Sequence, residues 1–294
     1  MSNFNIKKKQ LPKHTKEFEI SANWDFVSKK RDEAFAELSA QITVPGFRKG
    51  LAPKNLVGKY ISPESLYDRT GRKVLPEIYR ELVDKEKIQP VTTPDVELIE
   101  AKENEDWKFK VTVAEIPTVK VKNYKEKVKA AHSLAKDEKS KAPKAEGKPD
   151  SKDEKVEDKK VVAPVGEIFK VLLSEAEVEI PDLLTKEEVN RRVNQLQNDL
   201  KKVGMTMEHY LTSRELTPEK LQEQFVKDAE DMYKIEFIIA EIAKEQGFKV
   251  EESELGAIFA SAKTDKERSI AAQNMEWYEG ILRKQKVLDF LNDL

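Results

Sequence analysis

The sequence predicts an α+β N-terminal domain, in which an antiparallel sheet has helices on one face, and an all-α C-terminal domain joined to it by a charged flexible linker. Two observations lead to this prediction. Apolar residues alternate as in strands near residues 18–24 and 95–116, whereas helical spacing fills residues 181–291. Between these blocks the composition changes to charged and small residues, which places the domains at residues 1–122 and 165–294.

The linker is predicted from composition. Residues 125–160 are rich in Lys, Glu, Asp, Ala and Pro and contain no aromatic residue. Such a segment has too little apolar surface to offset the entropy that ordering would cost. We therefore predict that residues 123–164 form an extended, disordered tether.

In the N-terminal domain, the alternation over residues 18–24 predicts a half-buried strand. Asp25 then suits the N-cap of a helix. The apolar positions of that helix share one face: Val27, Ala34, Leu38 and Ile42.

A short helix follows near Pro53, and Ser62 with Pro63 starts a longer one that runs to Lys85. Pro76 is expected to kink or split it. Residues 95–101 and 106–116 alternate as two further strands, and the second has four apolar residues on one face: Trp107, Phe109, Val111 and Val113. The order strand, helices, strands is typical of helices covering one face of an antiparallel sheet.

The C-terminal domain contains only helical patterns. Pro181 begins a helix that Gly204 ends, and Pro218 begins another that Gly247 ends. The second helix has an apolar stripe at helical spacing: Leu221, Phe225, Met232, Ile235, Ile239 and Ile242. Further helices are predicted over residues 251–262, 265–272 and 275–291.

Composition excludes several classes of function. The formal net charge is −2, so any contact with nucleic acid must come from a local basic patch. The chain has no cysteine, which excludes disulfides, thiolate metal sites and cysteine nucleophiles, and fits a reducing compartment. The basic N-terminus lacks the apolar run of a secretory signal, and no apolar segment is long enough to span a membrane. We expect a cytoplasmic protein.

Residues 44–53, VPGFRKGLAP, stand out because two glycines flank an aromatic and basic tip. The simplest interpretation is a sharp connection between two helices, which Gly46 and Gly50 would permit. An exposed Phe47 beside Arg48 and Lys49 favours a binding surface instead, because an aromatic side chain on a loop gains most when a partner supplies its pocket. The Arg48 guanidinium suits bidentate contact with a carboxylate or a phosphate.

This tip resembles the G-F-R-x-G-x-x-P tip of the ribosome-binding domain of the trigger factor family, bacterial chaperones that meet nascent chains at the tunnel exit. Three later stretches, AEVEIPDLLTKEEVNRRVNQL, IIAEIAKEQGFKVEESEL and KVLDFL, resemble the helical substrate-binding domain of the same family. The two co-ordered blocks extend over residues 15–122 and 165–294. Because they occur in the family's order, the resemblance is more specific than a single short motif.

The resemblance implies an ATP-independent chaperone that docks on a large-subunit ribosomal protein and adjacent rRNA, and holds apolar segments of nascent chains. No cofactor is implied, and a weak homodimer away from the ribosome is left open. The implied docking residues are Gly46, Phe47, Arg48, Lys49, Gly50 and Pro53. Leu51 departs from the basic residue that many relatives have there, which lowers the charge of the tip.

Client-binding candidates on the C-terminal helices are large apolar residues that would line an open surface. Ordinary core packing is the alternative for each of them. They are Met205, Met207, Phe259, Trp277, Tyr278 and Phe290.

In the family, a prolyl isomerase domain of the FK506-binding type lies between the two blocks. Residues 123–164, with Tyr124 as their only aromatic residue, are too few and too charged to form such a domain. His14, His132 and His209 are far apart and lack the spacing of metal ligands. We therefore predict that the chain is not an enzyme. Two alternatives remain: residual isomerase activity, and a ribosome-tethered adaptor that does not hold clients.

Overall fold

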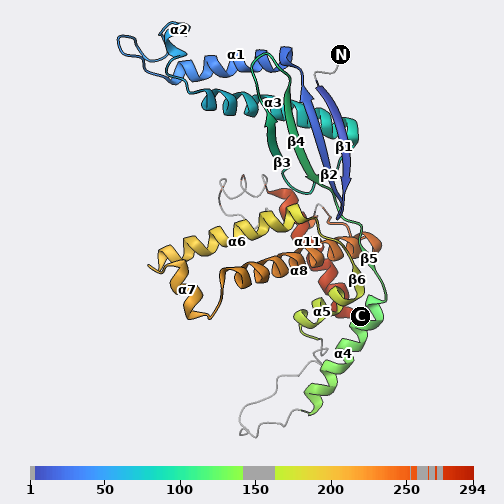
Figure 1. The fold of residues 1–294 in the computed structure, drawn as a ribbon. Coiled ribbons are helices and arrows are strands. Elements are labelled where there is room, and N and C mark those ends of the chain that lie inside the picture. Colours follow the sequence, from blue (N-terminus) through green and yellow to red (C-terminus); the bar gives the residue numbers. More distant parts are fainter. Residues whose placement is uncertain (1–3, 142–162, 252, 257–263, 265–268, 270–273) are drawn as a thin grey trace. The chain divides into compact units, whose positions relative to one another are not determined.

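The computed structural model describes residues 4–141, 163–251, 253–256, 264, 269 and 274–294 of the 294-residue chain (Figure 1). The chain divides into two compact units. Unit 1 comprises Met1–Ile116 and Pro181–Arg191, and unit 2 comprises Pro117–Ile180 and Arg192–Leu294.

Unit 1 contains a four-stranded antiparallel sheet in the order β1-β2-β4-β3. The strands are β1 (Phe4–Leu11), β2 (Thr15–Ala22), β3 (Asp95–Glu100) and β4 (Trp107–Ala114). The register of β2 and β4 brings their alternating apolar residues onto one face. These residues are almost completely buried, as predicted for the two strands: Phe18, Ile20, Trp107, Phe109, Val111 and Val113.

The strand β1 is not predicted from the sequence. Its sequence, FNIKKKQL, places three lysines in succession and hides the alternation that indicates a strand. β1 lies at the edge of the sheet, and within the described part of the chain its one partner is β2. Lysines are frequent on edge strands because they discourage pairing with another chain. The strand is thus specified by its partner more than by its own pattern.

Two helices, α1 (Trp24–Gln41) and α3 (Pro63–Glu86), cover one face of this sheet (Figure 1). Their buried side chains pack on the apolar face of the strands: Val27, Val74, Ile78 and Leu82. The predicted start of α3 is confirmed, since the Ser62 hydroxyl accepts a hydrogen bond from the Ser65 N–H at 3.2 Å.

Of the local predictions for these helices, the Asp25 cap is wrong, and so is the splitting of α3, one of the two alternatives predicted for Pro76. Asp25 does not cap α1 but lies in its first turn, because Asn23 is the N-cap residue and the Trp24 N–H donates to the distant Asp106 carboxylate at 2.9 Å. Pro76 does not split α3, which continues through it to Glu86. The buried residues on both sides of Pro76 hold the helix together despite the missing hydrogen bond.

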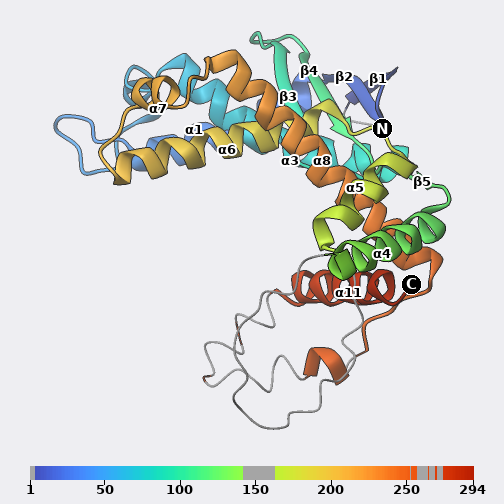
Figure 2. The same ribbon diagram turned by 90° about the horizontal axis from the view of Figure 1, so that it is seen from below.

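Unit 2 is built around a core shared by four helices (Figure 2). They are α4 (Tyr124–Lys141), α5 (Val165–Glu175), α8 (Pro218–Glu245) and α11 (Met275–Asp293). In the sequence, β5 (Lys120–Val121) precedes α4 and β6 (Ala176–Glu177) follows α5. The two strands pair antiparallel. The fully buried side chains at the centre are Val128, Ile168, Leu172, Ile238, Ile242, Val287 and Leu291.

Helix α4 corrects the prediction that a disordered linker starts at residue 123. Tyr124 and Val128, one helical turn apart, are buried in the core of unit 2. The His132 ring accepts a hydrogen bond from the Ala163 N–H at Nδ1 and lies 2.9 Å from the Leu291 carbonyl oxygen at Nε2. Both contacts are made by a neutral imidazole that has its proton on Nε2. The apolar stripe of α4 is narrow, so the composition of the segment conceals it.

The rest of the predicted linker, residues 142–162, lies outside the described residues. The helices predicted over residues 251–262 and 265–272 fall largely outside them as well.

The buried Tyr124 ties α4 to the end of α8. Its hydroxyl donates to Glu245 at 3.2 Å and accepts from the Gln246 side-chain amide at 3.3 Å. Burial, followed by the charge of Glu245, raises the pKa of Tyr124 to about 12. Because the unfolded chain releases this proton near pH 10, the stability that the phenol contributes is complete below about pH 10 and is lost as the pH rises through 12.

We therefore expect Tyr124→Phe to lower the free energy of unfolding by about 1 kcal/mol at neutral pH. The difference from the wild-type chain should shrink as the pH rises above about 10, where the wild type begins to lose its own advantage. Urea unfolding of both chains across this pH range, followed by circular dichroism, measures the difference. A difference that stays constant up to high pH would contradict the proton linkage.

Two further helices precede α8. These are α6 (Asp182–Lys202) and α7 (Met207–Ser213), of which the sequence predicts only the first. The predicted helix ends at Gly204 and Gly247 are confirmed, since both glycines have positive φ values, 70° and 69°. Within unit 2, Arg192 joins α6 to α8 through Asp228, at 3.7 Å, and the Met232 sulfur, at 3.6 Å.

Candidate functional site

The candidate site is the loop between α1 and α3, residues 42–61, which we call the tip loop. It lies at the end of α1 that is farthest from the sheet and contains the short helix α2 (Lys54–Val57) (Figure 1). Three buried residues, Val44, Val57 and Ile61, anchor it. They pack against partly buried side chains of α1 and α3, among them Phe35, Leu38 and Leu66. The tip loop therefore has a small core of its own.

Two consecutive tight turns, residues 44–47 and 48–51, shape the tip. In each turn the N–H of the fourth residue donates to the carbonyl of the first at 3.0 Å. The third residue is Gly46, with φ 85°, in the first turn and Gly50, with φ 77°, in the second. A positive φ at the third position is characteristic of a type II turn. Glycine is favoured there because it adopts this conformation at little steric cost. This explains why two glycines flank the tip.

The two glycines differ in their surroundings, and this leads to a prediction. A Cβ atom on Gly50 would lie 3.0 Å from the Ala40 carbonyl oxygen, whereas one on Gly46 would meet open space. Gly46→Ala should cost about 1 kcal/mol from backbone strain alone, and Gly50→Ala about 2–3 kcal/mol. Urea unfolding of the two variants measures these losses. Equal losses in the free energy of unfolding would show that the contact with the Ala40 carbonyl oxygen does not destabilise the Gly50 variant.

The surface of the tip loop is both apolar and basic. Phe47 and Leu51 are 41% and 69% exposed, and Leu56 and Tyr60 are exposed as well. Residues 38–63 of the sequence contain four basic residues and no acidic one. The four are Arg48, Lys49, Lys54 and Lys59, and within the described part of the chain none of them forms an ion pair.

The basic residues of α1 and α3 contrast with those of the tip loop. Lys73 pairs with Glu37 at 2.6 Å, and this hydrogen bond raises the pKa of Lys73. A hydrogen bond from Lys30 to Glu77 likewise raises the pKa of Lys30. Paired cations of this kind are already neutralised locally. The unpaired cations of the tip loop remain available to an external anion.

The structure brings all the predicted docking residues together in this one exposed loop: Gly46, Phe47, Arg48, Lys49, Gly50 and Pro53. Four more residues on the same surface are not predicted from the sequence: Lys54, Leu56, Lys59 and Tyr60. The absence of acidic residues between Glu37 and Glu64 is the signal in the sequence that marks them.

The client-binding candidates are distributed over several elements of unit 2. Met205 is exposed just after α6, and Trp277 is 61% exposed near the start of α11. The Tyr278 ring contacts that of Trp277, with 4.9 Å between centroids. Met207 is partly buried.

The client-binding candidates Phe290 and Phe259 are not found on the exposed surface of unit 2 that the structure describes. Phe290 packs against the core, where its ring contacts Phe248 at 5.6 Å, which favours the core-packing alternative for this residue. Phe259 lies outside the described residues.

Sequence reasoning missed several exposed apolar residues of unit 2, among them Val203 and Ile281. Val203, 71% exposed, precedes Gly204 at the end of α6, and Ile281 lies one helical turn after Trp277 on α11. The spacing of four residues between Trp277 and Ile281 places them on one helix face, so it was a signal available in the sequence.

The described residues include no group of three or more histidine or acidic side chains that could hold a metal ion. Among them, no helix is long and apolar enough to cross a membrane.

Comparison with protein-family models gives two matches. Residues 4–146 match the model described as bacterial trigger factor protein, and residues 150–291 match the model of its C-terminus. The two matches leave only residues 147–149 between them.

Several curated relatives are similar over part of the chain. Trigger factor of Limosilactobacillus reuteri (strain DSM 20016) is 40% identical over 113 residues, which are 38% of this chain and 26% of the relative. Trigger factor of Moorella thermoacetica is 32% identical over 115 residues, 39% of this chain and 26% of the relative. The matched part thus spans about a quarter of the length of these relatives.

A solved structure of the trigger factor chaperone, described in terms of promiscuous substrate recognition in folding and assembly, resembles the whole chain. It superposes with a TM-score of 0.62 over 98% of this chain and 99% of that chain, at 17% sequence identity. At this identity the likeness shows the fold alone.

Proposed function

The chain belongs to the trigger factor family, and from this membership we propose that it is an ATP-independent chaperone that docks on the ribosome and holds nascent polypeptides. In this proposal the tip loop binds a ribosomal protein and adjacent rRNA of the large subunit near the exit tunnel. The helices of unit 2 bind apolar segments of unfolded chains. The protein acts in the cytoplasm and needs no cofactor.

The observation that carries the proposal is the surface of the tip loop. An exposed aromatic side chain stands beside unpaired cations on a backbone that two hydrogen-bonded turns shape. The ribosome presents phosphates and acidic side chains, to which Arg48 and Lys49 are complementary. The chain has a net charge of −2, so this local patch supplies the attraction that the whole molecule lacks.

Client binding is assigned to exposed apolar residues on different helices of unit 2. Val203 and Met205 lie around the end of α6, and Trp277 and Ile281 lie on α11. Each patch is small, so each contact is weak, and a client is released as it folds and withdraws its apolar segments. Flexible methionine side chains suit clients of varied shape.

A two-part experiment tests the proposal. Purified chain is sedimented with ribosomes through a sucrose cushion, and light scattering is recorded when a guanidinium-unfolded enzyme is diluted into buffer with or without the chain. We expect the chain to pellet with ribosomes and to suppress the scattering. Pelleting without suppression would indicate the adaptor instead of the holdase, and absence of pelleting would overturn the docking proposal.

We further propose that the chain has no prolyl isomerase activity. Residues 147–149 are all that lies between the two family matches, and they are too few to form a domain. Helix α4 of the N-terminal match packs into the core of unit 2 with α5 of the C-terminal match. A proline-limited refolding assay tests this, and acceleration of the slow phase by the chain would contradict it.

A further inference from the structure

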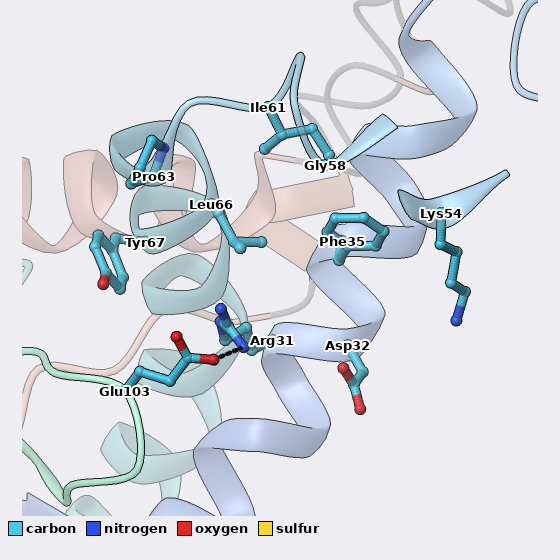
Figure 3. A pocket seen from close by; sticks show the side chains of 10 residues that line it. All are labelled: Arg31, Asp32, Phe35, Lys54, Gly58, Ile61, Pro63, Leu66, Tyr67 and Glu103. Atoms are coloured by element: carbon cyan, nitrogen blue, oxygen red, sulfur yellow. Dashed lines mark ion pairs between the residues drawn. The ribbon is translucent and has the colours of Figure 1, made fainter. Parts of the chain in front are cut away.

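Unit 1 contains a cavity of about 490 Å³ between α1, α2 and the start of α3, which we call the α1–α3 pocket (Figure 3). Its volume is within the range of roughly 300–1,000 Å³ that is typical of ligand sites. One part of its wall is apolar and is formed by Phe35, Ile61, Pro63, Leu66 and Tyr67. The other part is charged and is formed by Arg31, Asp32, Lys54 and Glu103.

The apolar wall is held in place by the two cores of unit 1. Phe35 and Leu66 pack against the buried residues of the tip loop. Tyr67 packs on the sheet core, where its ring meets the edge of the buried Trp107 at 5.6 Å. Gly58 also lines the pocket, and a Cβ atom there would lie 4.0 Å from the Phe35 ring. The pocket is therefore preformed, and at Gly58 its wall has no side chain.

The charged wall indicates which ligand fits. Arg31 Nη1 pairs with Glu103 Oε1 at 3.0 Å, as the dashed line in Figure 3 marks. Asp32 and Lys54 add one charge of each sign, so the two cations are balanced by two anions. Because these charges cancel, the wall offers a phosphate no net attraction. An uncharged peptide backbone can accept from the guanidinium or the ammonium and donate to the carboxylates.

We propose that the α1–α3 pocket binds one bulky apolar side chain of an unfolded polypeptide, together with the backbone on either side of it. This inference rests on the proposed chaperone function, and it adds a client contact within the unit that carries the tip loop. Ile61 and α2 belong both to the tip loop and to the pocket, so the pocket adjoins the proposed docking surface.

Gly58→Leu tests the proposal by filling the pocket from its wall. Gly58 has φ −55° and ψ −25°, so a leucine there is compatible with the backbone. The matched control is Gly166→Leu in the first turn of α5, where an added Cβ atom would have no neighbour within 4 Å. The probe is a ten-residue peptide of glycine, serine and asparagine with one central photoreactive benzoylphenylalanine.

On irradiation with the intact wild-type chain, we expect crosslinks to residues 54–67, located by mass spectrometry. Gly166→Leu should give the same yield, and Gly58→Leu should reduce it by about tenfold because the apolar contact is lost. As a second measurement on the wild-type chain, an unlabelled peptide with phenylalanine at the centre should suppress these crosslinks. The same peptide with serine at the centre should not.

Equal yields from Gly58→Leu and the wild type would overturn the proposal, as would crosslinks found only in unit 2 or equal competition by the two peptides. Ribosome pelleting and suppression of aggregation are recorded for the same three proteins. Their failure in the wild type would overturn the proposed function, whereas wild-type pelleting and suppression without crosslinks to residues 54–67 would overturn the pocket alone.

Discussion

A chain carrying Phe47→Ala, Arg48→Ala and Lys49→Ala is expected to remain in the supernatant when ribosomes are pelleted, while its thermal unfolding stays unchanged. The three side chains are exposed and belong to no buried cluster of unit 1. The turn that begins the tip is closed by the Phe47 backbone N–H, which alanine retains. The variant should therefore fold normally and lose the whole contact surface, a reduction in affinity of at least about 100-fold.

Single variants separate the apolar part of this contact from the ionic part. Arg48→Ala and Lys49→Ala should each lower the slope of log affinity against log salt by about 1, and Phe47→Ala should weaken binding with the slope unchanged. Arg72→Ala is the control, since this exposed cation of α3 pairs with Asp68 at 2.9 Å. If Arg72→Ala weakened binding as much as Arg48→Ala, net charge and not the tip loop would govern docking.

Val128→Asp should have the largest effect on stability. Val128 is fully buried on α4, in the core of unit 2. An uncompensated carboxylate at such a position costs about 3–5 kcal/mol, enough to unfold many domains of this size. Urea unfolding followed by circular dichroism measures the loss of helix in unit 2.

Leu134→Asp is the matched control for Val128→Asp. Leu134 is on the same helix but is 65% exposed. Its substitution should change the free energy of unfolding by no more than about 0.5 kcal/mol. If the two variants were equally stable, residues 124–141 would behave as the tether that their composition suggests, and the placement of α4 would be wrong.

The parts of the fold that could be predicted are those that neighbouring residues specify. Ser62 caps α3 through the N–H of Ser65, three residues away, and Gly204 and Gly247 end helices because they adopt positive φ. The alternation in β4 is likewise readable within eight residues. Each of these signals is local, so the sequence around it is sufficient.

Helix α4 could not be predicted in this way because distant residues specify it. Tyr124 contacts Glu245, and His132 contacts Leu291. Only a narrow stripe of α4 meets the core, and the charged residues around it dominate the composition. The capping of α1 by Asp106, more than 80 residues from Trp24, was hidden for the same reason.

In the candidate site, too, some features are specified by neighbouring residues and others by distant ones. The glycines of the tip loop follow from local turn geometry, and the sequence places Phe47 between them. In unit 2 the exposure of an apolar residue depends on which helix face packs. Trp277 is exposed and Phe290 contacts the core, although both lie on α11. No spacing rule within the helix alone distinguishes them.

We propose that the tip loop touches the large ribosomal subunit. The chain has no cysteine, so a single cysteine can be labelled selectively. Leu51→Cys, at a position 69% exposed beside the tip, carries a photoreactive maleimide, and Leu134→Cys carries the same label as a control. With empty ribosomes we expect position 51 to crosslink to a protein or rRNA of the large subunit, well above the yield from position 134. Equal yields from the two positions would contradict the claim.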